Sequence, residues 1–163
     1  INNPTQLGLV MKLISKDYHN LGLPPSLDTC TRDTFAEHTQ LTAQAIKYIA
    51  KQMVSTLTHL HANNVSHGDV YAHNTMINNE YNVLFGDFGA ATNLDSLTDY
   101  KRLQMQRIEV RAIGCLIDDL LSVCNENNLD TSKLKLISQQ CMNSELAKRP
   151  DLSTLSAKLE GEE

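Results

Sequence analysis

Four stretches of the chain repeat apolar residues every three or four positions, which is the period of a helix with one buried face. The two longest run from about Thr42 to Leu60 and from about Ile108 to Cys124. Two shorter ones follow, Leu134–Met142 and Leu152–Leu159. The pattern predicts these four helices and a mainly helical fold.

Three short runs have the composition of β-strands. Leu7–Ile14 is a nearly continuous apolar run, which is typical of a buried strand. Thr75–Ile77 and Tyr81–Phe85 flank the polar residues Asn78–Glu80, which suit a hairpin turn. We therefore expect helices with one small β-hairpin, an α+β fold overall.

Length and composition set limits on the kind of protein. A chain of 163 residues can form one domain or one large lobe with its own core. Its formal charge of −5 argues against a general binder of nucleic acid or of anionic membranes. No apolar run approaches the roughly 20 residues of a membrane span. We expect no nucleic-acid and no membrane partner.

The cysteines indicate the compartment. Cys30, Cys115, Cys124 and Cys141 lie far apart, and none belongs to a Cys-x-x-Cys pair. This spacing does not indicate a zinc site. Cys115 and Cys124 fall within a helical pattern, where a buried free thiol is the ordinary interpretation. Free thiols fit a reducing, cytoplasmic compartment.

Two polar motifs flank the predicted hairpin. Residues 67–74 read His-Gly-Asp-Val-Tyr-Ala-His-Asn, and residues 86–89 read Gly-Asp-Phe-Gly. Asn74 lies at the start of the first predicted hairpin strand and Asp87 at the end of the second, so the hairpin would bring the two residues together. Their oxygens are the ligand types that Mg²⁺ prefers, completed by phosphate and water. Asp69, on the incoming loop, could accept a hydroxyl proton at the same place.

Asp and Asn residues before strands also cap ordinary turns, and one Asp-Phe-Gly is weak evidence by itself. Here the loop, the hairpin and the Asp-Phe-Gly occur in the right order and at the right separation for a phosphate and metal site, and this combination favours such a site. The combination resembles the catalytic loop and metal-binding motif of the protein kinase family. The resemblance implies that the chain is the large, carboxy-terminal lobe of a kinase-like fold, with ATP and Mg²⁺ as cofactors.

The resemblance also implies roles for individual residues. Asp69 in the catalytic loop 67–74 would be the catalytic base. Asn74 and Asp87 would hold the metal and, through it, the ATP phosphates. Residues 87–89 would be the metal-binding motif and 90–107 a short activation segment.

The adenine site follows from the same alignment. Residues 1–16 would be the last strand of the amino-terminal lobe and the hinge, and residues 17–163 the large lobe. Met11 would stand at the gatekeeper position, and the main chain of Lys12 and Ile14 would hydrogen-bond the adenine. Met76 would lie beneath it.

Three further residues match positions that support the site in the family. His67 and Phe88 would be packing members of the regulatory stack. Glu109 stands in the central buried helix where the family usually has Asp.

Other positions depart from the family pattern. Gly68 replaces the arginine that usually grips a phosphate on the activation loop, so we expect no control by loop phosphorylation. Tyr71 and His73 stand where kinases usually offer Lys or Arg to the transferring phosphate. The charge would then come from elsewhere, or transfer would be slower.

The chain lacks the glycine-rich loop and the strand lysine that cover the ATP phosphates. It begins at Ile1, shortly before an apolar run, so we expect a piece of a longer kinase whose amino-terminal lobe is a partner from the parent chain. The piece alone is expected to bind nucleotide poorly and to be inactive.

The parent would transfer the ATP γ-phosphate to a Ser, Thr or Tyr hydroxyl of a protein substrate. The first alternative is a small-molecule kinase of the aminoglycoside or choline type, because His-Gly-Asp also occurs there. The second is a pseudokinase-like scaffold or binding module.

Overall fold

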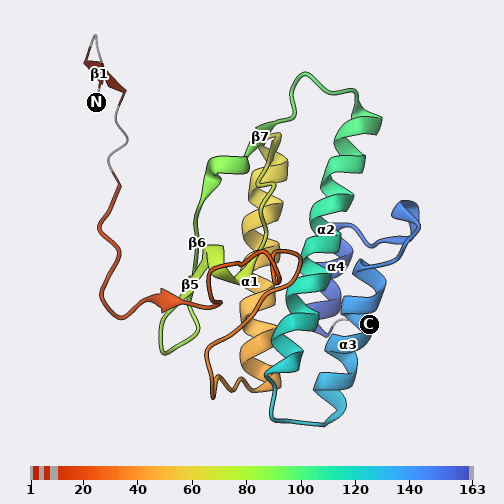
Figure 1. Ribbon diagram of the computed structural model, residues 1–163. Helices are drawn as coiled ribbons and strands as arrows, with labels where there is room; N and C mark the ends of the chain where they lie inside the picture. The colour runs from red at the N-terminus through yellow and green to blue at the C-terminus, as the bar shows by residue number, and fades with distance from the viewer. Residues whose placement is uncertain (1, 4–5, 8–10, 162–163) are drawn as a thin grey trace.

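Four helices form the body of the molecule in the computed structural model, which describes residues 2–3, 6–7 and 11–161 (Figure 1). The two long helices, α1 and α2, run beside each other, and two shorter helices, α3 and α4, pack against them. Their bounds are α1 Ala43–Ala62, α2 Asp99–Ser122, α3 Leu129–Cys141 and α4 Leu152–Glu160. The prediction of a mainly helical fold with a small sheet is confirmed.

Helix α1 agrees closely with the sequence pattern. Thr42 caps its start, since the Ala45 N–H donates to Thr42 Oγ1 at 3.1 Å. Its inward face consists of fully buried apolar side chains: Ile46, Ile49, Met53 and Leu57. Each contributes roughly 1.5–3 kcal/mol by leaving water. The cap and this stripe are local features, so the sequence alone predicts the helix.

Helix α2 begins well before the predicted start at Ile108. Thr98 is its N-cap, and residues 99–107, expected to belong to the activation segment, form its first turns. These residues include Lys, Arg, Leu, Gln and Met, which are good helix formers. They carry no apolar stripe, so a search for hydrophobic periodicity overlooks them.

Helix α3 also starts earlier than predicted, at Leu129 rather than Leu134. The side chain of Asn128 accepts the Thr131 N–H at 3.0 Å, and Thr131 Oγ1 accepts the Asn128 N–H at 3.0 Å. This reciprocal capping box starts the helix in a polar stretch.

The close contact of α2 with α3 depends on Gly114. A Cβ at this residue would lie 2.7 Å from Cys141 Cβ and 2.9 Å from the Ser138 carbonyl oxygen. The backbones can approach because there is no side chain between them. Ser138 Oγ donates to the Gly114 carbonyl at 2.9 Å across the same contact.

The predicted hairpin is small and lies beside α1 (Figure 1). The predicted hairpin consists of β5 (Thr75–Ile77) and β6 (Val83–Phe85), and β3 (His19–Asn20) pairs with the other edge of β5. The remaining two-residue strands form two antiparallel pairs, β1 (Asn2–Asn3) with β2 (Gln6–Leu7) and β4 (Val65–Ser66) with β7 (Thr92–Asn93).

Gln52 attaches the hairpin to α1. Its Nε2 donates to the Tyr81 carbonyl at 2.8 Å, and its Oε1 accepts the Val83 N–H at 2.9 Å. One carboxamide thus satisfies both a donor and an acceptor at the start of β6. The hairpin flanked by Asn74 and Asp87 is therefore fixed to α1.

The buried strand predicted over Leu7–Ile14 is wrong at Met11–Ile14, whereas Leu7 belongs to β2. Residues 8–10 lie outside the described residues, and Met11–Ile14 have no regular secondary structure. Met11 is 75% exposed and Leu13 is 91% exposed, and the segment extends away from the helices (Figure 1). A buried strand needs a neighbouring strand for its hydrogen bonds and a surface on which to pack. Among the described residues, nothing provides either of these to residues 11–14.

The four cysteines are free thiols. Cys141 lies in the core between α2 and α3, and burial raises the pKa of its thiol to about 12. Cys115 and Cys124 are half-buried rather than fully buried, and Cys30 is exposed. None of the helices in the described ranges has the length and apolar character needed to cross a membrane.

Candidate active site

Asn74 connects Asp69 with the segment that contains Asp87, the two other residues expected in the site. Its Nδ2 donates to Asp69 Oδ2 at 2.8 Å and to the Asp69 carbonyl at 3.1 Å. Its own carbonyl accepts the N–H of Gly86 at 3.0 Å, one residue before Asp87. The structure thus brings Asp69, Asn74 and the start of the Asp-Phe-Gly motif together at one edge of the hairpin.

Asp87 is exposed, and its backbone has a conformation that is uncommon for residues other than glycine. Its φ and ψ are 56° and 71°, the left-handed region, and the Gly89 N–H donates to its Oδ1 at 3.2 Å. The left-handed conformation costs a residue with a side chain on the order of 1 kcal/mol. Such conformations are concentrated at functional sites, and here the local hydrogen bond helps to hold it.

The donor set fits Mg²⁺ held together with phosphates. Because the amide nitrogen of Asn74 faces Asp69, its Oδ1 is left to act as an acceptor. In the described part of the chain no three His, Cys, Asp or Glu side chains converge as a metal cluster. One or two carboxylates completed by an amide, phosphate and water are the usual protein contribution to a Mg²⁺–nucleotide site.

His67 packs in the stack expected from the resemblance. Its ring is fully buried, lies 3.9 Å from the Phe85 ring and 4.7 Å from the Phe88 ring, and stacks on the former. Nδ1 accepts the Asp69 N–H at 3.3 Å, so the hydrogen lies on Nε2, 2.9 Å from the Gly86 carbonyl. His67 thereby joins the catalytic loop to the second motif.

Gly68 is required by its surroundings. Its φ is +82°, and a Cβ there would lie only 2.6 Å from the Ala90 carbonyl oxygen. Any side chain at this position would be strained by the backbone and would strike the segment after Asp-Phe-Gly. The glycine in place of the family's arginine therefore permits close packing of the two motifs.

Glu109 of α2 accepts a hydrogen bond from the catalytic loop. Its Oε1 accepts the Gly68 N–H at 2.7 Å, and its Oε2 lies 2.6 Å from His61 Nε2. Burial tends to raise the pKa of Glu109, but the hydrogen bonds from His61 and Gly68 outweigh it and lower that pKa. Glu109 was expected in this helix, whereas the contribution of His61, 48 residues away, has no signal in the sequence.

The residues expected around adenine are not assembled in the described chain. Met76 is half-buried in β5, opposite Leu84 of β6, while Asn20 of β3 pairs on its other side. Met11, Lys12 and Ile14 are exposed in the extended segment before β3. No hydrogen bond among the described residues joins that segment to Met76, and the adenine contacts remain a prediction.

A second support of the catalytic loop comes from Asp33, which the sequence pattern did not single out. Its Oδ1 accepts the Ala72 N–H at 2.9 Å and lies 3.6 Å from His73 Nδ1. Burial raises the pKa of Asp33, opposed by the hydrogen bond from Ala72. Above it the rings of Tyr71 and His73 stack, with centroids 5.1 Å apart.

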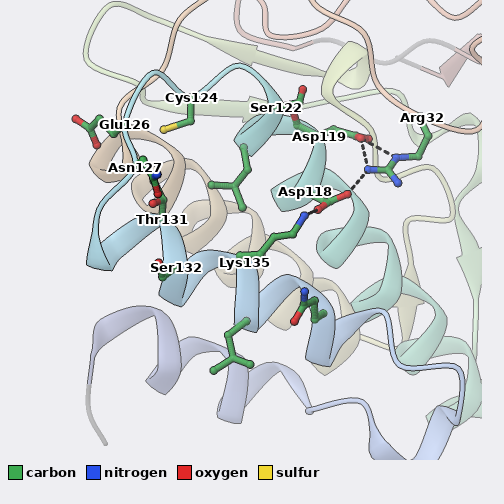
Figure 2. Close-up of a pocket in the computed structure, with 13 residues that line it drawn as sticks. Arg32, Asp118, Asp119, Ser122, Cys124, Glu126, Asn127, Thr131, Ser132 and Lys135 are labelled. Atoms are coloured by element: carbon green, nitrogen blue, oxygen red, sulfur yellow. Dashed lines mark hydrogen bonds and ion pairs between the residues drawn. The ribbon is translucent and has the colours of Figure 1, made fainter.

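Away from these residues, a hollow lies between α2 and α3 (Figure 2). Its volume is about 730 Å³, and none of its lining residues is an expected site residue. At its rim Arg32 contacts Asp118 and Asp119, and Lys135 contacts Asp118. These charges neutralise one another, so the hollow has no free charge of either sign at that rim.

Comparison with known proteins gives a family match. The family model described as the protein kinase domain matches residues 2–110, which include both motifs and the first half of α2. The CTD kinase subunit alpha of Saccharomyces cerevisiae is 34% identical over 61 residues, 37% of this chain and 12% of that protein. The serine/threonine-protein kinase PLK1 of Xenopus laevis is 34% identical over 73 residues, 42% of this chain and 12% of that protein.

A bacterial relative is also similar. The serine/threonine-protein kinase PrkC of Bacillus subtilis is 42% identical over 50 residues, 31% of this chain and 8% of that protein. The matched part of the chain thus spans only about a tenth of the length of these curated relatives. The family model matches more than half of the 163 residues, and the loop and Asp-Phe-Gly motif meet as described: the chain belongs to the protein kinase family.

Proposed function

We propose that this chain is the large lobe of an ATP-dependent protein kinase, which transfers the γ-phosphate to a hydroxyl group of a protein. The observation that carries the proposal is the double role of Asn74, bonded to Asp69 by its side chain and to Gly86 by its main chain. Two relatives are named serine/threonine-protein kinases, which favours Ser or Thr as acceptor over Tyr and over a small molecule.

Asp69, Asn74 and Asp87 would divide the chemistry. Asp69 accepts the proton of the acceptor hydroxyl, and the Asn74 amide holds its carboxylate in one orientation. Asp87 and Asn74 Oδ1 would hold Mg²⁺, which neutralises charge on the phosphates when bound. Phosphoryl transfer depends on such positioning and charge compensation more than on covalent participation by the protein.

The rest of the ATP site would come from the segment before β3 and from the parent chain. Residues 1–16 would be the end of the amino-terminal lobe and the hinge, with Met11, Lys12 and Ile14 at the adenine and Met76 beneath it. The exposure of Met11 and Ile14 agrees with surfaces that a second lobe and a nucleotide would cover. A cytoplasmic location fits the four free thiols.

A binding or scaffold function is the second candidate. The stacked rings of Tyr71 and His73 fill the place where a kinase usually offers a cation to the transferring phosphate. Neither side chain has a permanent positive charge, and Asp33 adds a carboxylate beside them. A lobe of this kind could bind nucleotide without transferring phosphate.

Two measurements on the full-length protein separate these functions. Titration with Mg²⁺–ATP should give binding that Asp87→Asn and Asn74→Ala weaken at least tenfold. Transfer of labelled γ-phosphate to a mixture of Ser- and Thr-containing peptides should be lost in Asp69→Asn while Mg²⁺–ATP binding is kept. Binding without transfer in the unaltered protein would favour the scaffold, and Mg²⁺–ATP binding indifferent to Asp87 would refute the metal site.

A further inference from the structure

Two carboxylates from outside the catalytic loop accept its main-chain N–H groups, and the first of these contacts is that of Glu109 with Gly68. The second lies four residues further along, where the 3-10 helix η1 (Ala72–Asn74) leads into β5. The residue before η1, Tyr71, makes no side-chain cap, so the first N–H of η1 needs an acceptor from elsewhere. Asp33 provides it, across 39 positions of the sequence.

The carboxylate of Asp33 is withdrawn from water, with its side chain 2% exposed. A buried carboxylate is expensive unless hydrogen bonds compensate it. Here the compensation comes from the loop itself, through Ala72 N–H at 2.9 Å, with the His73 ring at 3.6 Å. The stability of the buried charge and the position of the loop are therefore coupled.

Asp33 is in turn held by α2. Its main-chain N–H donates to Asp119 Oδ2 at 3.0 Å. The neighbouring Arg32 donates from Nε to Asp119 Oδ1 at 2.6 Å and from a terminal nitrogen to Asp118 Oδ2 at 2.6 Å (Figure 2). Asp119 and Glu109 belong to the same helix, so one rigid element positions both ends of the loop.

We propose that Asp33 is a positioning residue that fixes the main chain between Asp69 and Asn74 and so sets the distance between the proposed base and the proposed metal ligand. Its importance for phosphotransfer rests on the function proposed above, whereas its effect on the loop does not. Residues that orient metal ligands typically change metal affinity about 10–100-fold when they are replaced.

Amide hydrogen exchange by NMR on the ¹⁵N-labelled chain tests the effect on the loop. In Asp33→Ala the Ala72 amide should exchange at least tenfold faster, while amides of the α1 core such as Ile49 and Met53 keep their rates. Asp33→Asn, which keeps an oxygen acceptor, should restore most of the protection. Asp28→Ala, an exposed aspartate in the same segment, is the matched control and should change neither.

A uniform acceleration over Ala72, Ile49 and Met53 would show a merely structural role and overturn the proposal, as would an unchanged Ala72 rate. If Asp33→Ala does not fold, Arg32→Met tests the same support. It should accelerate Ala72 exchange severalfold, and an unchanged rate would again overturn the proposal.

Titration with Mg²⁺–ATP connects the loop to the site. In the full-length protein, Asp33→Ala should weaken Mg²⁺–ATP binding about tenfold, and Asp28→Ala should not. Unchanged affinity in Asp33→Ala would overturn the link to the metal site. If the unaltered protein does not bind Mg²⁺–ATP while the Ala72 effect is present, the proposed function fails and the positioning of the loop stands.

Discussion

The carboxylate of Glu109 accepts the main-chain N–H of Gly68 at 2.7 Å and thereby ties the start of the catalytic loop to the centre of α2. The same side chain binds His61 at the end of α1, and both partners are buried. One carboxylate of α2 thus holds the end of α1 and the start of the loop, which lie 48 and 41 positions away from it.

Replacing Glu109 should destabilise the lobe strongly. Glu109→Ala leaves the buried His61 ring and the Gly68 N–H without their acceptor, a loss of about 3 kcal/mol in the free energy of unfolding. Urea unfolding followed by circular dichroism measures it. Glu126→Ala, which also removes an acceptor of a main-chain N–H but from a half-buried carboxylate at the start of α1, should cost less. Equal losses of unfolding free energy in the two variants would show that the buried contacts of Glu109 contribute no more than the contact of Glu126.

Acid should weaken the same network. The pKa of Glu109 is lowered from its ordinary value of 4.5, so its contribution to stability is complete above that value and is lost as the pH falls through the lowered pKa. Asp33, whose pKa is raised, contributes in the opposite sense. Unfolding free energies measured from pH 6.5 to pH 3 should fall less in Glu109→Gln than in the unaltered chain. Parallel curves would contradict the assignment.

Gly68 should tolerate no side chain. Gly68→Ala combines the cost of φ +82° with a contact of 2.6 Å to the Ala90 carbonyl, and Gly68→Arg should be no better despite restoring the usual family residue. Gly161→Ala is the matched control, because it has φ +88° and nothing within 4 Å of its Cβ. Thermal unfolding should show a loss of about 1 kcal/mol for the control and a clearly larger one for Gly68→Ala. Similar losses would mean that the Ala90 contact relaxes freely.

The α2–α3 contact should be equally intolerant at Gly114. A Cβ there meets Cys141 and Ser138 below 3.0 Å, so Gly114→Ala should cost about 1–3 kcal/mol by overpacking. Gly86→Ala has its nearest neighbour at 3.9 Å and should change the unfolding free energy little. An unchanged melting temperature in Gly114→Ala would show that the two helices can separate without loss.

Much of the fold follows from local pattern. Helix α1 was predicted because its cap and its apolar stripe lie within its own residues, and the hairpin because two short apolar runs flank a polar turn. The early starts of α2 and α3 were missed because their first turns are polar and depend on capping by Thr98 and Asn128. The strand over Leu7–Ile14 was wrong at Met11–Ile14, since an apolar run alone cannot supply a pairing neighbour.

The candidate residues of the site all lie in two short segments, 67–74 and 86–89. Residue types and spacing are therefore enough to propose phosphate and metal binding there. What holds those segments could come only from the tertiary structure. Asp33 and Glu109 accept main-chain N–H groups of the loop from 39 and 41 positions away, and Glu109 also contacts His61, 48 positions from it. A hydrogen bond between remote residues leaves no periodicity in a sequence, because it depends on the path of the chain between them.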